Sequence, residues 1–150
     1  MGVIQAICLS EQKGTAKTPV ECAVLIKNHG LQDDAHAGTW HRQVSLLADE
    51  TIQDFNALGA SVTYGAFGEN LVVSQIPLTT LPIGTRLVSG TIILEVTQIG
   101  KVCHTPCQIH HRIGHCIMPT QGVFAKVIQG GILHVNDTLT VISSCDAISF

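Results

Sequence analysis

The sequence predicts a mainly β domain, built as a sheet or barrel with short helices. Apolar runs of strand length, such as residues 23–26 and 91–96, recur along the chain between Gly, Asn and charged residues. None of them approaches the roughly 18 apolar residues of a membrane-spanning helix. The length of 150 residues is that of a single domain large enough to bury its own core. We therefore expect one domain over residues 1–150.

Short strands and hairpins account for most of the chain. β-branched and aliphatic residues between turn-forming ones predict strands over roughly residues 3–9, 22–27 and 42–47. Two turn dipeptides, Ser89-Gly90 and Asn136-Asp137, predict hairpins that join residues 85–88 to 91–96 and residues 132–135 to 138–142. Residues 122–128 are apolar and fit either a helix or a strand.

One segment is predicted to be helical, from residue 48 to residue 58. Its apolar side chains recur at every third position. Asp49 and Glu50 stand where the partial positive charge of a helix N-terminus favours acidic residues, and Gly59 can end the helix.

The composition argues against several classes of partner. The net charge is −3, and the eight Lys and Arg residues are scattered, so no basic stripe could neutralise a row of phosphates and nucleic acid is not expected. The N-terminus lacks the charged start and apolar core of a signal peptide, so we expect no membrane association and a cytoplasmic location. In that compartment, six cysteines predict free thiols, metal ligands or reactive sulfur rather than disulfides.

The densest chemistry lies in an irregular segment, residues 99–121, that interrupts the strands. Three thiols, four imidazoles and one ammonium group share it: Lys101, Cys103, His104, Cys107, His110, His111, His115 and Cys116. A long irregular segment inside a small domain is usually a functional loop. We therefore expect any chemistry of this protein to centre on this cluster.

Three interpretations of the cluster are open. In the first, Lys101 or a protonated His104 favours the thiolate of one cysteine, which can attack sulfur, carry a persulfide or ligate a soft metal such as molybdenum. In the second, Cys103, Cys107 and Cys116 bind zinc together with one histidine, although their spacing lacks the paired two-residue knuckles of typical zinc sites. In the third, the cysteines are buried apolar residues and the histidines solvate a loop.

Two further groups of residues stand out. His36, His41 and Arg42 could bind an anion, because a guanidinium can donate two parallel hydrogen bonds to a phosphate. The alternative is a turn whose polar side chains satisfy one another. Glu69 and Asn70 directly precede an apolar strand, and we expect them to accept backbone hydrogen bonds that pin a loop.

Together these residues resemble the MOSC domain, the module found at the C-terminus of molybdenum cofactor sulfurases. The resemblance covers roughly residues 1–143 and rests on several motifs in the family's order, namely His36-Ala37-Gly38, the run from His41 to Leu47, Phe67 to Leu71, Leu81 to Thr85 and the Cys103 loop. The residues around Cys103 are similar to those of the small stand-alone MOSC proteins.

The resemblance implies a β-barrel and, in some members, binding of the pterin-based molybdenum cofactor, molybdopterin. It selects Cys103, which follows the Thr97-Gln98 pair, as the cysteine that carries sulfur or ligates molybdenum. The other site residues that it implies are His104 and Lys101 to stabilise the thiolate, Cys107 as the second candidate cysteine, and His36, His41 and Arg42 to hold the cofactor phosphate.

The main hypothesis is thus a MOSC-domain protein of molybdenum cofactor metabolism, with sulfur-transfer activity like that of the sulfurases. Sulfurases also contain a pyridoxal-phosphate desulfurase domain, for which these 150 residues leave no room. A partner is therefore expected, either a cysteine desulfurase, a molybdenum cofactor biosynthesis protein or a molybdoenzyme. The alternative is a non-catalytic zinc-binding or scaffold module that acts through a partner enzyme.

Two turns depart from the family's pattern. Where the family commonly has Gly-Asp, this chain has Asp33-Asp34 before the His-Ala-Gly motif and Asn136-Asp137 in the last turn. Asn tolerates a positive φ better than most residues, whereas Asp33 adds negative charge beside an anion site.

Overall fold

The computed structural model describes residues 1–13, 15–100 and 121–142, and this part of the chain is mainly β, as the sequence predicts. None of its helices is both long and apolar enough to cross a membrane. The elements in chain order are β1 (Gly2–Leu9), β2 (Thr18–Val20), β3 (Cys22–Ile26), β4 (Gly30–Leu31), β5 (Val44–Ala48), α1 (Asp49–Ala57), β6 (Leu71–Ser74), the 3-10 turn η1 (Leu78–Thr80), β7 (Arg86–Ser89), β8 (Ile92–Ile99), β9 (Val123–Gln129), β10 (Gly131–His134) and β11 (Thr138–Ile142).

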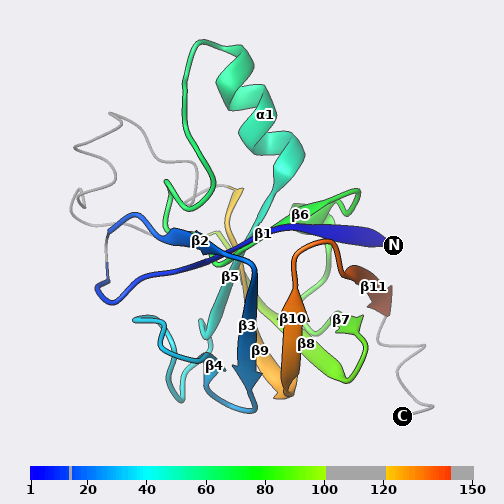
Figure 1. The fold of residues 1–150 in the computed structure, drawn as a ribbon. Helices are drawn as coiled ribbons and strands as arrows, with labels where there is room; N and C mark the ends of the chain where they lie inside the picture. Colours follow the sequence, from blue (N-terminus) through cyan, green and yellow to red (C-terminus); the bar gives the residue numbers. More distant parts are fainter. Residues whose placement is uncertain (14, 101–120, 143–150) are drawn as a thin grey trace.

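Seven strands close into a barrel, which confirms the predicted fold class. They pair in the order β7-β8-β9-β5-β6-β1-β11, and β11 pairs with β7 to close the ring. All of these pairs are antiparallel except β5 with β6. Two strands, β11 and β2, pair with the same edge of β1. The first residues of β1 pair with β11 and its last residues pair with β2. A second sheet, β10-β3-β4, lies beside the barrel, with β3 and β10 side by side (Figure 1).

Buried apolar side chains form two clusters, one inside the barrel and one outside its wall. Because successive strand residues point to opposite faces, Leu46 fills the barrel interior while Leu47 packs on the outside of its wall. The outer cluster also receives Ile52 of α1, which is 1% exposed, and Phe124 of β9. The helix is therefore held by one buried side chain against the outer surface of β5 and β6.

The predicted strand over residues 42–47 begins two residues later, at Val44. The reason lies in Gln43, whose side-chain Oε1 accepts the N–H of Val127 at 2.9 Å. That N–H would otherwise be free to continue a strand ladder, so the pairing of β5 with β9 ends at Val44 and Ala125. His41 and Arg42 consequently lie in the loop before β5 rather than in a strand. The helix (α1) and the strand option for residues 122–128 (β9) are confirmed.

The first predicted hairpin is confirmed, but the second is wrong in its pairing. β7 and β8 pair around Gly90 as expected. β10 and β11 both form where they were predicted, yet β10 pairs with β3 while β11 pairs with β1 and β7. The turn between them docks on β1 instead, since Asn136 N–H donates to Ile4 O at 2.7 Å and Ile4 N–H donates to Asp137 O at 2.9 Å. The chain thus crosses from one sheet to the other at this turn.

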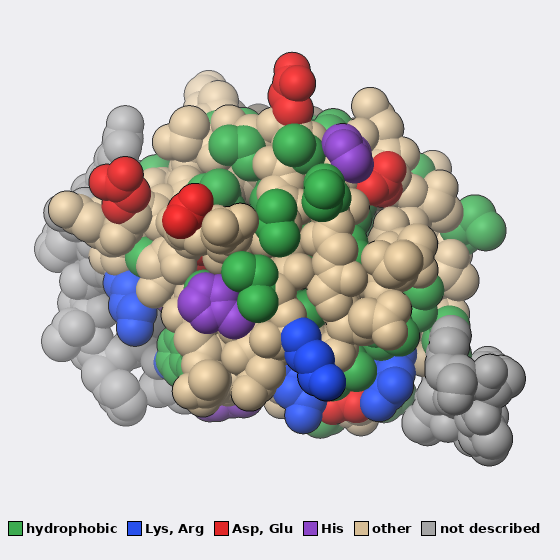
Figure 2. All heavy atoms as spheres, turned by 60° about the horizontal axis from the view of Figure 1, so that its bottom comes forward, with side chains coloured by type: hydrophobic (Ala, Val, Ile, Leu, Met, Phe, Trp, Pro, Cys, Tyr) green, Lys and Arg blue, Asp and Glu red, His purple; other side chains and the backbone are tan. Residues whose placement is uncertain are grey.

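The exposed face of the second sheet is apolar in part. Val24, Ile26 and Ile132 are 39%, 38% and 59% exposed, and Val24 and Ile132 are register partners. On the face of the molecule seen in Figure 2, Lys and Arg side chains are interrupted by acidic and uncharged ones rather than aligned in a stripe.

The two residues that replace the family's turn glycines, Asp33 and Asn136, adopt a left-handed backbone conformation. Asp33 has a φ of 68° and Asn136 a φ of 77°. Glycine adopts this region without cost, and Asp and Asn are the next most tolerant residues, so the substitutions keep the turns. Asp33 is exposed to solvent, which screens its charge.

The backbone at Asn136 generates a first prediction. The left-handed region costs an ordinary residue roughly 1–2 kcal/mol, and the short polar side chain of Asn offsets part of that cost whereas the methyl group of Ala does not, so we expect Asn136→Ala to lower the free energy of unfolding by about 1 kcal/mol. Asn136→Gly should leave the stability equal or higher. Urea unfolding of the two variants measures the difference, and equal losses in both would show that the side chain, not the backbone angle, matters.

Candidate functional site

The loop before β5 holds the guanidinium of Arg42 against two aromatic rings. Its Cζ lies 4.7 Å from the ring centre of Trp40 and 5.7 Å from that of Phe124. Within the described part of the chain, Arg42 forms no ion pair, and its buried Nε is the one buried side-chain donor that lacks a hydrogen-bond partner. A buried donor without a partner costs about 1–3 kcal/mol. Arg42 therefore presents unused donor capacity, which is what an anion site requires.

His41 lies at the base of the segment that carries the cysteine cluster. Its Nε2 is 2.8 Å from Gln98 Oε1, and Gln98 Nε2 donates to Gly100 O at 2.7 Å. Gly100 N–H in turn donates to Gly122 O at 2.6 Å, so the described residues on either side of 101–120 are bonded to each other. The Thr97 hydroxyl donates to the backbone oxygen of His41. These bonds fix His41 beside the point where residues 101–120 leave and rejoin the barrel.

Lys17 and Asp34 form a buried ion pair that contacts the ring of His36. Lys17 Nζ is 2.8 Å from Asp34 Oδ1, and both side chains are 0% exposed. The same Nζ is 3.0 Å from Ser10 Oγ and 2.9 Å from His36 Nδ1. Asp34 also accepts the backbone N–H of Ser10 at Oδ1 and that of His36 at Oδ2, and a hydrogen bond from the Asn70 side chain contributes to its low pKa. The pair thus joins the loop of residues 10–17 to the loop of residues 30–38.

Burial and pairing act in opposite directions on the pKa values of this pair. Burial by itself would raise the pKa of Asp34, but the hydrogen bond and charge of Lys17, with the Ser10 N–H, outweigh it and hold this pKa below its ordinary 3.8. Burial lowers the pKa of Lys17 by more than Asp34 raises it. The Asp34 carboxylate is therefore ionised at neutral pH, and Lys17 is the cation that lies against it.

Glu69 and Asn70 pin the neighbouring loop, as the sequence predicts. Glu69 accepts the N–H of Gly65 at 2.9 Å and of Phe67 at 3.0 Å, and Asn70 Oδ1 accepts the N–H of Ser45 at 3.0 Å. Burial raises the pKa of Glu69 by more than these hydrogen bonds lower it. At Gly65, with φ of 90°, a Cβ would stand 2.1 Å from the backbone oxygen of Lys17, so only glycine allows this loop to approach the ion pair.

The two cysteines among the described residues differ in reactivity. Cys8 is fully buried, and burial, with the charge of Glu69, raises the pKa of its thiol to about 12. Such a thiol is inert as a nucleophile at neutral pH. Cys22 is exposed on β3, in the second sheet. Neither belongs to the loops around Arg42.

Comparisons with known proteins identify the family. Residues 33–140, most of the chain, match the family model of the MOSC domain. The chain belongs to the MOSC domain family. Its fold is similar to that of YuaD from Bacillus subtilis, with a TM-score of 0.78 and 18% identity over 95% of this chain and 97% of that one. No curated protein matches the chain at a significant level.

Two further structures show the same MOSC fold. YiiM from Geobacillus stearothermophilus aligns with a TM-score of 0.71 and 20% identity, over 95% of this chain and 76% of that one. YiiM from Escherichia coli aligns with a TM-score of 0.66 and 18% identity, over 94% and 70%. At these identities the similarity concerns the fold alone.

The three described candidate residues of this MOSC domain meet at one indole. Trp40 Nε1 donates to the backbone oxygen of His36 at 2.7 Å, its ring centre lies 5.9 Å from that of His41, and Arg42 stacks on it. The remaining candidates, Lys101, Cys103, His104, Cys107 and Cys116, lie outside the described residues. In the ranges that are described, no group of three or more His, Cys, Asp or Glu residues could hold a metal ion.

Sequence reasoning missed three residues of this site. Trp40 could have been found, because it is the one tryptophan of the chain and stands between His36 and His41. Gln98 was noted only as a family marker, and the structure adds its contact with His41. Lys17 carries no local signal, since a lysine among Thr, Ala and Pro normally faces solvent.

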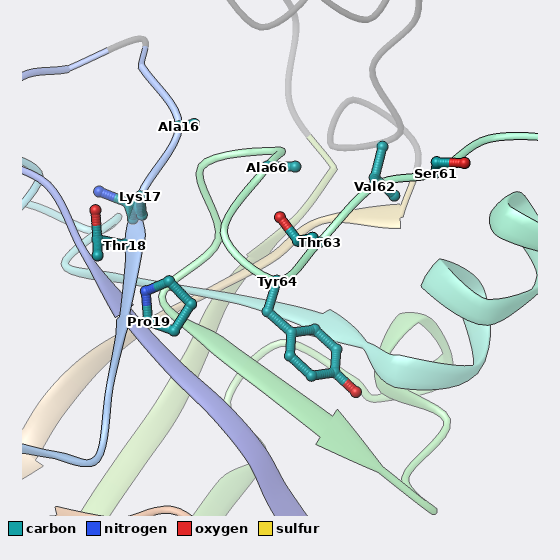
Figure 3. Close-up of a pocket in the computed structure, with 9 residues that line it drawn as sticks. All are labelled: Ala16, Lys17, Thr18, Pro19, Ser61, Val62, Thr63, Tyr64 and Ala66. Atoms are coloured by element: carbon teal, nitrogen blue, oxygen red, sulfur yellow. The ribbon is translucent and has the colours of Figure 1, made fainter.

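A cavity of about 330 Å³ opens beside the ion pair. Figure 3 shows Ala16 to Pro19 on one side of it and Ser61 to Tyr64 with Ala66 on the other. The Tyr64 hydroxyl donates to Asp49 Oδ1 at 2.9 Å, so this wall is tied to the start of α1. Lys17 lines this cavity, while its ammonium faces Asp34 and His36.

The buried pair generates a second prediction. We expect Lys17→Met to lower the free energy of unfolding at neutral pH by about 3–5 kcal/mol, because Asp34 is left buried and unpaired. The double variant Lys17→Met/Asp34→Asn should lose less, and Lys27→Met, which replaces an exposed lysine after β3, should lose little. Urea unfolding measures all three.

The pH dependence follows from the same carboxylate. In the wild type the depressed pKa of Asp34 stabilises the fold above 3.8, and this contribution disappears as the pH falls through the lower folded-state pKa. Without Lys17, burial dominates and raises the pKa of Asp34, so Lys17→Met should recover stability relative to the wild type between pH 7 and pH ~4. A pH-independent difference would contradict this assignment.

Proposed function

We propose that this MOSC domain binds the molybdenum cofactor and carries sulfur as a persulfide on Cys103. One observation carries the proposal: Arg42, with a buried and unpartnered Nε, lies in the same loop as His41, which is bonded to the base of the 101–120 segment. Cys103 follows Gly100 by three residues in the sequence. A cationic group thus lies beside the described ends of the segment that carries the candidate thiol.

The residues present fit the phosphate of a pterin cofactor. Arg42 offers guanidinium N–H groups and shares no ion pair with a described carboxylate. His41 adds an imidazole group beside the same indole, and His36 contacts that indole through its backbone oxygen. Charge-assisted hydrogen bonds from such groups are the usual means of holding a phosphate. When bound, the cofactor would supply a molybdenum centre with affinity for thiolate and sulfide.

Persulfide transfer to Cys103 requires a donor but no added oxidant. The Cys103 thiolate attacks the outer sulfur of a donor protein's persulfide, the S–S bond of the donor breaks, a new S–S bond forms on Cys103, and the donor leaves as a thiolate. Lys101 and His104 would favour the attacking thiolate. The donor is a cysteine desulfurase or a molybdenum cofactor biosynthesis protein, and the acceptor is the cofactor or a molybdoenzyme.

Measuring the intact mass of the protein tests whether Cys103 carries sulfur. We expect protein incubated with a cysteine desulfurase and cysteine to gain the mass of one sulfur atom, and to lose it on treatment with dithiothreitol. Cys103→Ala should gain none, whereas Cys22→Ala, which removes an exposed thiol on the second sheet, should behave as the wild type. Equal labelling of Cys103→Ala and wild type would refute the carrier role. One tightly bound zinc ion in place of sulfur would favour a zinc-binding scaffold.

Measuring the affinity of the protein for molybdopterin tests whether Arg42 holds the cofactor. Arg42→Lys keeps the charge but loses the planar stack on Trp40 and Phe124 and the fork of N–H donors. We expect it to weaken binding of molybdopterin about 10- to 100-fold, the range that corresponds to losing a hydrogen bond to a charged group. Equilibrium dialysis measures the affinity. Arg86→Lys is the matched control, because that arginine pairs with Glu95 at 3.5 Å on β7, outside the site.

A further inference from the structure

Two cations lie against the indole of Trp40. Lys13 Nζ is 5.2 Å from the centre of the ring, and Arg42 Cζ is 4.7 Å from the same centre. The electron-rich face of an indole attracts a cation, which contributes about 0.5–1 kcal/mol at an exposed position. The ring thus brings a lysine of the 10–17 loop to the arginine of the loop before β5.

Hydrogen bonds hold both partners of the lysine–indole contact. The hydroxyls of Ser10 and Thr15 both donate to the backbone oxygen of Gln12, at 3.0 Å and 2.9 Å, directly before Lys13 in the chain. The Trp40 Nε1 donates to a backbone oxygen at 2.7 Å. The place of the ammonium therefore depends on two loops that are bonded in position, and not on the lysine side chain alone.

The described residues supply no carboxylate to neutralise either cation. The four ion pairs of the described ranges include neither Lys13 nor Arg42. Asp34 is already paired with Lys17. Glu11, the one acidic residue of the 10–17 loop, is exposed and forms no ion pair within the part of the chain that the structure describes. Two like charges beside one ring repel each other, and an anion that binds beside them relieves this repulsion.

We propose that Lys13 is a second cationic group of the anion site at Arg42, and that the two cations together select a phosphate monoester over an anion with a single charge. The role of Lys13 rests on the proposed function of this site, because it concerns the same anion. A phosphate monoester carries nearly two negative charges at neutral pH, whereas a phosphodiester or a carboxylate carries one. The screening length at physiological salt is about 8 Å, so a phosphate beside the indole interacts with both cations.

The two cations contribute in different ways. Arg42 has a buried Nε and a planar fork of N–H donors, which can bind the oxygen atoms of an anion in a fixed geometry. Lys13 is exposed, and its ammonium is a point charge on a flexible stem. Arg42 therefore supplies affinity for oxyanions in general, whereas Lys13 mainly adds affinity for the second charge. Lys13 is thus a specificity-determining residue.

Titration with a matched pair of small ligands tests this role on the intact protein. Methyl phosphate is a monoester and dimethyl phosphate is the corresponding diester. Trp40, the one tryptophan of the chain, reports binding through its fluorescence at constant ionic strength and a pH of ~7.5. We expect the wild type to prefer the monoester about tenfold. Lys13→Met should weaken the monoester about fivefold and the diester about twofold, the range of an exposed charge interaction.

Two variants separate the charge of Lys13 from a structural role. Lys13→Arg keeps the charge and the contact with the ring, so it should retain the preference for the monoester. Lys27→Met, which removes an exposed lysine after β3, should bind both ligands as the wild type does. Equal weakening of the two ligands by Lys13→Met, or a loss of the preference in Lys13→Arg, would overturn the proposal.

The same titrations distinguish failure of this inference from failure of the proposed function. If Lys13→Met binds methyl phosphate as the wild type does while Arg42→Lys binds it more weakly, the anion site stands and the role of Lys13 is wrong. If the wild type binds neither ligand, the anion site of the proposed function is wrong, and the role of Lys13 is wrong with it.

Discussion

The buried ion pair between Lys17 and Asp34 holds together the loops from which the candidate site is built. Removing two charged groups from water is expensive, and the cost is offset only when every lone pair and proton finds a partner. Here Asp34 takes two backbone N–H groups besides the ammonium, and Lys17 meets Ser10 and His36 as well. The loops of residues 10–17 and 30–38 are therefore constrained to one arrangement, in which these groups meet.

From this pair, a series of contacts leads outward to the site. Asp34 fixes the backbone of His36, the backbone oxygen of His36 holds the indole of Trp40, and the indole orients Arg42 and His41. Each side chain that could touch an anion is thus positioned by another group, which reduces the ordering required on binding. The unpartnered Nε of Arg42 is tolerated because the rest of its guanidinium is packed against two rings.

The barrel fixes the two described ends of the chain segment in which the sequence places the cysteine cluster. β8 and β9 run antiparallel and are bonded up to Ile99 and Val123, and the bond between Gly100 and Gly122 extends the pairing by one step. The long segment between them begins and ends at one fixed place, beside His41. Function carried on a loop while the scaffold stays rigid is the common arrangement for catalytic and binding sites.

Much of this could be predicted from the sequence because the responsible signals are local. Strand patterns, the helix after β5, the left-handed turn at Asn136 and the loop-pinning role of Glu69 depend on residues close in the chain. The strand partners of β10 and β11 could not be predicted in this way. The turn at Asn136 bonds to Ile4 of β1, more than 130 residues earlier in the sequence, and the two strands do not pair with each other as a hairpin. The burial of Lys17 and its contact with His36 likewise depend on three loops that meet only in the folded barrel. The sequence by itself determined the family, the strands and the candidate residues, and the tertiary structure decided which of them meet.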